Sequence, residues 1–202
     1  MTVSRAAEFE RVIRGGEVVV FPSDTVYGLA CDPEDEAAVE RLYALKGRAP
    51  EKAAAVMFFS LDAALDALPE IGERTRAALS ALTPGGVTLL VPNPSRRFPL
   101  ACGADPDTLG VRVVDVPVLC GVQLAVLQSS ANPSGGADAR TLAAVAPAMR
   151  AGAGLAIDGG ELPGVPSTVV DLRSYEVDGR WRIVRQGVVE SEAVAGSLGS
   201  NE

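Results

Sequence analysis

Hydrophobic positions along the chain recur with two different periods. Apolar residues three or four positions apart, as on one face of a helix, occur in segments 3–14, 36–45, 62–68, 71–82 and 141–150. Short continuous apolar runs, typical of strands covered on both faces, lie at 18–21, 54–59, 87–91, 109–113, 124–127, 155–157, 167–172 and 181–184. We also expect a short helix from Pro117. This alternation predicts an α/β fold with one large, mixed, twisted sheet flanked by helices.

Glycine and proline mark where several of these elements end. Gly15 and Gly16 close the first helix, Pro22 closes the first strand, and 84–86 ends the fourth helix. The length of 202 residues fits one domain. We therefore predict a single domain over residues 1–190 and a C-terminal tail over 191–202 that is helical or frayed.

Composition and charge exclude several classes of function. Apolar residues make up 48% of the chain and charged residues 22%, so it can bury a core and is not a disordered polymer. The net charge of −8 argues against a globally basic nucleic-acid binder and leaves a local basic cleft open. The absence of histidine excludes Ser-His-Asp triads, Cys-His dyads and histidine-based zinc sites.

The cysteines and the N-terminal residues indicate in which cellular compartment the protein is expected. Cys31, Cys102 and Cys120 form no C-x-x-C pair, so we expect reduced thiols and no metal site made by the protein. The first residues carry no apolar core of a secretory signal, and no apolar run reaches the roughly 20 residues that a membrane helix needs. We expect a cytoplasmic protein without a membrane anchor.

Three loops carry the polar groups from which a site could be built. Residues 22–28 follow a strand and contain Ser, Asp and Thr, as a ligand loop or an ordinary turn would. Lys46-Gly47-Arg48 closes a helix, where the cations either complement the helix dipole or clamp a phosphate. Residues 129–136 combine short hydroxyls, an amide and glycines, as an anion cradle or a turn would. No Walker or Rossmann glycine pattern is present.

Cations also occur within or at the end of strands. Arg112 lies inside an apolar strand, where a charge is costly unless it meets a buried partner or a ligand carboxylate. Both alternatives stay open on the sequence. Ser167 opens a late strand, and Arg185 ends the last one.

Seven segments, taken in order, resemble the YrdC/TsaC family of L-threonylcarbamoyladenylate synthases over about residues 5 to 190. They are Pro-Ser-Asp-Thr-Val-Tyr-Gly-Leu (22–29), Lys-Gly-Arg (46–48), Thr-Pro-Gly-Gly-Val-Thr-Leu (83–89), Gly-Val-Arg-Val (110–113), Ser-Ala-Asn-Pro-Ser-Gly (130–135), Ser-Thr-Val-Val-Asp (167–171) and Arg-Gln-Gly (185–187). Each segment is weak alone, but seven in the family's order are specific.

The resemblance implies an enzyme, a nucleotidyltransferase. Its reaction makes threonylcarbamoyl-AMP and pyrophosphate from ATP, L-threonine and bicarbonate, with Mg²⁺ expected on the nucleotide. A partner transferase complex then passes the threonylcarbamoyl group to a tRNA adenosine. The fold implied is a twisted mixed sheet with a large concave cationic cleft, which would also allow RNA, including double-stranded RNA, to bind.

The resemblance also implies roles for nine residues. ATP-binding positions are Lys46, Arg48, Thr108, Ser130, Asn132 and Arg185. The threonine moiety is expected at Thr25, Arg112 and Ser167, with Arg112 facing its carboxylate. Lys46 and Arg48 would also be the catalytic cations, offsetting charge on the leaving pyrophosphate. We expect Lys46 to lie on the cleft and outside the core.

The chain departs from the family pattern at a few places. Ala49 stands where a proline is usual, Thr83-Pro84-Gly85-Gly86 replaces Trp-Pro-Gly-Pro, and a helix between Pro117 and Ser130 is expected to be a turn shorter. Two alternatives to the synthase therefore remain: a relative without the activity that binds RNA or nucleotide, and an enzyme that transfers a carbamoyl group to another acceptor.

Overall fold

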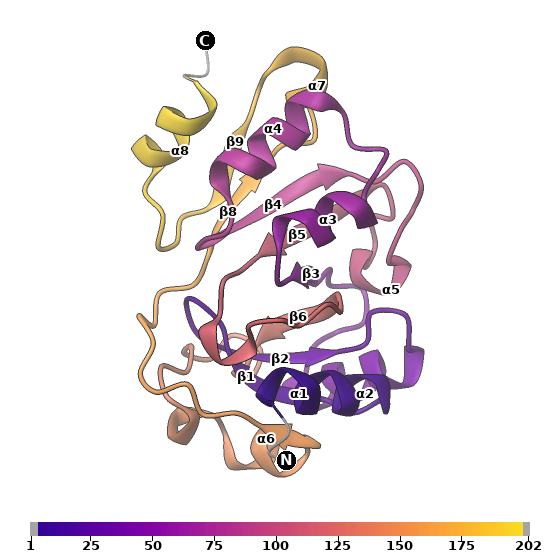
Figure 1. The fold of residues 1–202 in the computed structure, drawn as a ribbon, viewed down its shortest axis with the longest axis vertical. Helices are drawn as coiled ribbons and strands as arrows, with labels where there is room; N and C mark the ends of the chain where they lie inside the picture. The colour runs from indigo at the N-terminus through magenta and orange to yellow at the C-terminus, as the bar shows by residue number, and fades with distance from the viewer. Residues whose placement is uncertain (1–3, 200–202) are drawn as a thin grey trace.

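The computed structural model describes residues 4–199, and over that range its strands form one mixed sheet (Figure 1). The strand order is β7-β1-β2-β6-β3-β5-β4-β8-β9. Pairs β1/β7, β3/β5 and β4/β8 are parallel and the other neighbours are antiparallel, so the predicted mixed sheet is confirmed. The strands are β1 (Val19–Pro22), β2 (Tyr27–Cys31), β3 (Ala55–Phe58), β4 (Val87–Pro92), β5 (Thr108–Val113), β6 (Val126–Ser130), β7 (Leu155–Ala156), β8 (Thr168–Asp171) and β9 (Arg182–Arg185).

Helices flank the sheet, as predicted. In Figure 1, α1 lies beside the lower strands, whereas α3 and α4 lie over the middle and upper ones. The helices are α1 (Arg5–Arg14), α2 (Glu36–Lys46), α3 (Leu61–Ala67), α4 (Glu73–Leu82), α5 (Pro99–Cys102), α6 (Pro147–Ala151), α7 (Tyr175–Asp178) and α8 (Ser191–Leu198), with 3₁₀ turns η1 (Pro117–Leu119) and η2 (Leu142–Ala144). Among residues 4–199, no helix is both long and apolar enough to cross a membrane.

Local sequence signals set the ends of these helices. The side chains of Ser4, Asp35 and Ser60 accept hydrogen bonds from backbone N–H groups in the first turns of α1, α2 and α3. Gly47 ends α2 with a left-handed φ of 61°, a conformation that glycine adopts without strain. Lys46 is therefore the last residue of α2, and Arg48 begins the loop that follows.

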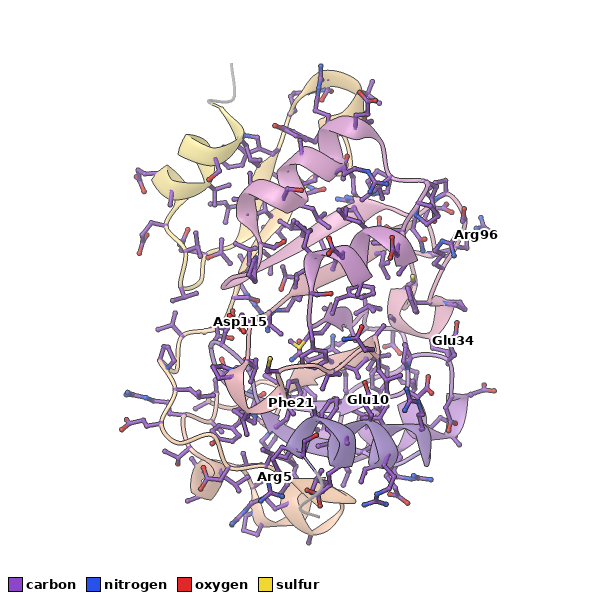
Figure 2. The ribbon with its side chains drawn as sticks, viewed as in Figure 1. Arg5, Glu10, Phe21, Glu34, Arg96 and Asp115 are labelled. Carbon is purple, nitrogen blue, oxygen red and sulfur yellow. The ribbon has the colours of Figure 1, made fainter. Side chains whose placement is uncertain are left out.

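The core lies on both faces of the sheet because residues along β1 alternate between two clusters. Val18 and Val20 belong to the larger cluster, under α2, α3 and α4. Val19 and Phe21 belong to the smaller one, beneath α1. Phe21 lies next to α1 (Figure 2), where its ring meets that of Phe9 edge to face at 5.8 Å.

One strand was missed and one predicted helix was wrong. Residues 27–31, for which no strand was predicted, form strand β2, because pairing with β1 and β6 outweighs the weak strand preference of Gly28 and Ala30. Segment 141–150 is not one helix, since Pro147 cannot continue η2 and starts α6 instead.

The short helix predicted from Pro117 is confirmed as the 3₁₀ turn η1, and strand β6 follows it near the predicted place. No helix continues from Leu119 to Ser130. Residues 191–198 form α8, whose Val194 is fully buried. The first residue of the helix predicted from Val3 lies outside the described residues.

Candidate active site

A cavity of about 470 Å³ lies over the middle of the sheet, bordered by β3–β5, β8 and β9 and by the loops after β1, α2 and β6. Seven of the nine predicted site residues line it: Thr25, Arg48, Thr108, Arg112, Ser130, Ser167 and Arg185. The two others, Lys46 and Asn132, lie directly behind Ser130. The fold thus brings together residues that are up to 160 positions apart in the sequence (185 − 25).

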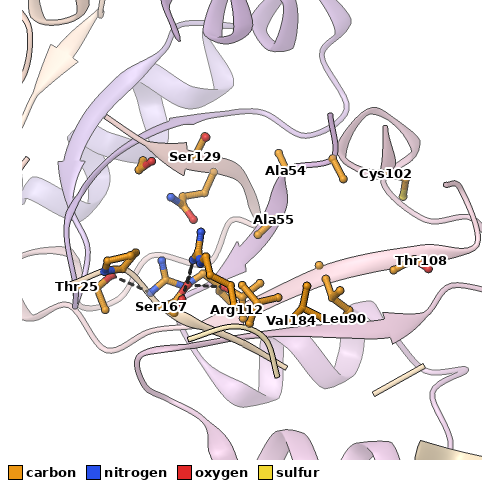
Figure 3. A pocket seen from close by; sticks show the side chains of 18 of the residues that line it. Thr25, Ala54, Ala55, Leu90, Cys102, Thr108, Arg112, Ser129, Ser167 and Val184 are labelled. Carbon is orange, nitrogen blue, oxygen red and sulfur yellow. Dashed lines mark hydrogen bonds between the residues drawn. The ribbon is translucent and has the colours of Figure 1, made fainter. Parts of the chain in front are cut away.

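Different side chains line the two ends of the cavity (Figure 3). Thr25, Ser167 and Arg112 gather at one end. Leu90 and Val184 lie toward the other, where Thr108 and Cys102 also lie. Arg182 lies near Leu90 as well, because Asp171 pairs with both, so this second end carries charged as well as apolar side chains.

Arg112 forms the floor of the end that Thr25 and Ser167 line. It is only 3% exposed. Its Nη2 donates to Asp24 Oδ1 at 2.5 Å and to Thr25 Oγ1 at 3.3 Å, while its Nε is buried without a partner. Burial lowers the pKa of the guanidinium, and nearby Asp24 opposes that shift. Of the two alternatives left open by the sequence, the internal ion pair is present, and donors remain for a ligand.

Ser167 and Arg185 line the cavity beside Arg112. Arg185 Nη2 donates to Ser167 O at 2.7 Å and to Ser167 Oγ at 3.2 Å, and Ser167 Oγ lies 2.8 Å from Thr88 Oγ1. The pairing of β8 with β9 shifts register at Val169/Val170, and Arg182, Val184 and Arg185 all line the cavity. An irregularity of this kind changes which face a strand residue takes, so Arg185 joins Val184 on one side.

Lys46 anchors the loop after β6. Its Nζ donates to Ser130 O at 2.6 Å, Asn132 O at 2.9 Å and Asn132 Oδ1 at 2.8 Å, and lies 3.2 Å from Ser130 Oγ. Burial is the main cause that lowers the Lys46 pKa to about 8, and the Arg48 charge adds to it. The expectation that Lys46 lies outside the core was wrong, because its side chain is 95% buried between α2 and β6.

Arg48 lines the cavity but is held by its own loop. Its Nη2 donates to Ala53 O and its Nε to Lys52 O at 3.4 Å, and the guanidinium carbon lies 5.8 Å from the centre of the Tyr43 ring. These contacts place a permanent cation in the cavity wall, close enough to Lys46 to lower its pKa.

Sequence reasoning missed several lining residues. Arg173 and Arg182 both bond Asp171, whose pKa falls to about 2 chiefly through the hydrogen bonds from Arg173. Thr88 and Asp138 also line the cavity. Thr88 stood within a quoted motif and could have been singled out, whereas the place of Arg182 depends on the pairing of β9. In all, five arginines and two aspartates line the cavity, and the cationic character of the whole cleft stays a prediction.

This geometry defines a class of protein: a mixed α/β fold with a cavity over its sheet that arginine and hydroxyl side chains line. The comparison with protein families narrows the class. The family model for Sua5, YciO and YrdC, described as "Telomere recombination", matches residues 11–187. The chain therefore belongs to the Sua5/YciO/YrdC family.

Curated relatives cover most of the chain. It is 36% identical over 181 residues to a protein of Chromohalobacter salexigens named threonylcarbamoyl-AMP synthase, covering 87% of this chain and 96% of that protein. It is also 36% identical over 178 residues to a protein of the same name from Stutzerimonas stutzeri, covering 86% of this chain and 95% of the other.

Solved structures share the fold. P. abyssi Sua5 complexed with L-threonine superposes with a TM-score of 0.84 at 27% identity, covering 98% of this chain and 59% of that one. E. coli YciO superposes with a TM-score of 0.76 at 24% identity, covering 93% and 91% of the two chains, which supports the fold alone. The chain spans about three fifths of the Sua5 chain and nearly the full length of the two bacterial relatives.

Proposed function

We propose that this protein is a threonylcarbamoyl-AMP synthase, which uses ATP, L-threonine and bicarbonate and releases pyrophosphate. Family membership supports the reaction, together with the printed names of relatives aligned over nearly their full length. The observation that carries the proposal within this structure is the arrangement of one cavity, with arginines in its lining and the Lys46 cluster beside it.

The roles of the residues follow from their positions. Arg112 and Ser167, with Thr25, would hold the amino acid through its carboxylate and hydroxyl. Lys46, Arg48, Ser130 and Asn132 would bind the phosphates, and Arg185 would lie between the two groups. Thr108 would lie beside the nucleoside, at the end of the cavity that also carries Leu90 and Val184.

The reaction needs positioning and charge compensation more than a proton shuttle. Bicarbonate releases hydroxide to give carbon dioxide, and the neutral threonine amine attacks its carbon, which forms an N–C bond. The proton that the amine loses combines with the hydroxide, so the products of this step are a carbamate and water. A carbamate oxygen then attacks the α-phosphorus, forming an O–P bond while the bond to the β-phosphate oxygen breaks and pyrophosphate leaves. Lys46 and Arg48 would offset the charge that develops on pyrophosphate. The mixed anhydride is prone to hydrolysis, so an enclosed cavity protects it.

Magnesium has no site of its own in this proposal. In the part of the chain that the structure describes, no group of three or more Cys, Asp or Glu side chains could hold a metal ion. Mg²⁺ would therefore be part of the substrate and arrive on the triphosphate. The proposed setting is cytoplasmic, and the product would go to a partner complex that modifies tRNA.

Pyrophosphate release from purified protein with ATP, Mg²⁺ and bicarbonate tests the proposal. We expect release that depends on L-threonine and a product whose mass matches threonylcarbamoyl-AMP. Release that is independent of threonine would instead favour carbamoyl transfer to another acceptor. A folded protein that binds nucleotide or RNA but releases no pyrophosphate would favour the inactive relative.

A further inference from the structure

Arg112 is a buried guanidinium that the protein only partly satisfies. It lies in the fourth of nine strands counted from the β9 edge of the sheet, and only its Nη2 hydrogen-bonds within residues 4–199. Its Nε is buried and has no partner. Buried polar groups are nearly always paired, so an unpaired N–H beside a cavity indicates a place kept for a ligand acceptor.

The carboxylate that meets Arg112 belongs to a residue outside the cavity lining. Asp24 does not line the cavity and its side chain is 17% exposed, yet its Oδ1 lies 2.5 Å from Arg112 Nη2. The loop that carries it is fixed from within, because Ser23 Oγ donates to Val26 O at 2.6 Å and accepts from Val26 N at 3.2 Å. The backbone turn next to Asp24 is thus fixed, and its carboxylate contacts Arg112 from outside the cavity lining.

The charges around Arg112 leave room for one more anion. Arg185 lies close enough to lower the pKa of Arg112, and its Nη2 donates only to Ser167. Of these two guanidinium groups only Arg112 is paired with a carboxylate, that of Asp24. A second carboxylate in the cavity would balance the pair and accept the hydrogen bonds that Arg112 does not use.

We propose that Asp24 is a positioning residue for the amino-acid substrate: it holds Arg112 through Nη2 and thereby presents the remaining N–H groups to the substrate carboxylate. This inference rests on the proposed function, because it takes threonine as the substrate. Asp24 itself does not contact the substrate.

Asp24 has two opposing physical effects on threonine affinity, so the inference can be tested by measuring that affinity. As a fixed partner, Asp24 lowers the cost of ordering Arg112 and improves threonine binding. As a negative charge, it competes with the substrate carboxylate and weakens binding. The 2.5 Å contact and the rigid loop favour the first effect.

The experiment is to compare wild type with Asp24→Asn, which keeps the shape and removes the charge. Threonine binding is measured by calorimetry without ATP, and KM for threonine and for ATP by pyrophosphate release. We expect threonine Kd and KM to rise about tenfold or more, with the ATP KM changed less than about threefold. Asp115→Asn is the matched control, because it removes the same charge from an exposed residue that follows β5 and does not line the cavity (Figure 2).

A second ligand distinguishes a role of Asp24 in positioning Arg112 from a general disturbance of the binding site. L-threoninamide lacks the carboxylate, so wild type and Asp24→Asn should bind it equally weakly, whereas they should differ for L-threonine. Thermal unfolding of each variant establishes that it is folded. An equal loss for both ligands would indicate a structural role, and unchanged or tighter threonine binding in Asp24→Asn would overturn the inference.

The outcomes for the two proposals are distinct. If wild type neither binds threonine nor releases pyrophosphate with it, the proposed function fails. If wild type does both and Asp24→Asn behaves like Asp115→Asn, only the positioning role fails.

Discussion

Lys46 and Arg112 are two buried cations of one site, and the protein satisfies them in opposite ways. Lys46 Nζ has four oxygen neighbours within 3.2 Å, and none of these oxygens belongs to a carboxylate. Arg112 is paired with the carboxylate of Asp24 but leaves Nε without a partner. The hydrogen-bonding capacity of Lys46 is therefore filled by uncharged oxygens, and Asp138 acts on its charge without a hydrogen bond. Arg112 is instead ion-paired with Asp24 and keeps an unused N–H donor.

The difference indicates two modes of anion binding. An ammonium has three N–H donors, so Lys46 must exchange a protein oxygen for a phosphate oxygen, or act on the phosphate through Ser130 and Asn132. Arg112 has donors to spare and can bind a carboxylate without giving up Asp24. We therefore expect nucleotide binding to reorganise the loop after β6, and threonine binding to leave Arg112 in place.

The largest effect is expected from Lys46→Ala. Turnover should fall by about a hundredfold or more, because a cation for the leaving pyrophosphate is lost. The free energy of unfolding should also fall by about 1–3 kcal/mol, because the oxygens of Ser130 and Asn132 lose their donor in a buried place. Pyrophosphate release and denaturant unfolding measure the two effects.

Lys52→Ala is the control for this variant. Lys52 is the only other lysine of the chain, and it is exposed. Its removal should change neither turnover nor stability appreciably. Full activity in Lys46→Ala would show that the phosphates are held by Arg48 and the loop after β6 alone.

Arg112→Ala should act on one substrate. We expect the KM for threonine to rise by more than about tenfold while the ATP KM changes less than threefold, because the arginine faces the amino-acid end of the cavity. Initial rates over both substrates measure this. Arg182→Ala, which removes an exposed guanidinium from the same cavity, should not show the same selectivity. Equal changes in both KM values would show that the Arg112–Asp24 ion pair is only structural. Arg112 would then not bind threonine, and the two modes of anion binding described above would not both exist.

The smallest effect concerns pH. The Lys46 pKa of about 8 lies below that of an ordinary lysine, so the ammonium loses its proton as pH rises through 8. ATP affinity should be highest below pH 8 and fall above it, by up to about tenfold for each pH unit. Calorimetric titration with ATP between pH 7 and 9 measures this. A flat profile would mean that the charge of Lys46 does not contribute to nucleotide binding, whereas in Lys46→Arg the decline should disappear.

The identity of the candidate residues could be predicted well from the sequence, but which of their side chains contact one another could not. Motif order singled out Lys46, Arg112 and Ser167, and the structure places each in or directly behind one cavity. Nothing in the sequence paired Asp24 with Arg112, because the two are 88 positions apart and meet only when β1 and β5 take their places in the sheet. The burial of Lys46 was also missed, since it depends on the loop after β6 folding over the end of α2.

The fold, like the site, has features that the sequence determines and features that only the tertiary structure decides. The apolar periods and turn residues by themselves determined that the chain is α/β, that α1, α2 and α4 are helices, and that most strands lie where predicted, because these features depend on neighbours in sequence. Only the tertiary structure decided that residues 27–31 form a strand, that β9 shifts register and carries Arg185 into the cavity, and that Arg112 retains unused donors. Each of these depends on partners distant in sequence, and a local pattern holds no information about which partner a segment will meet.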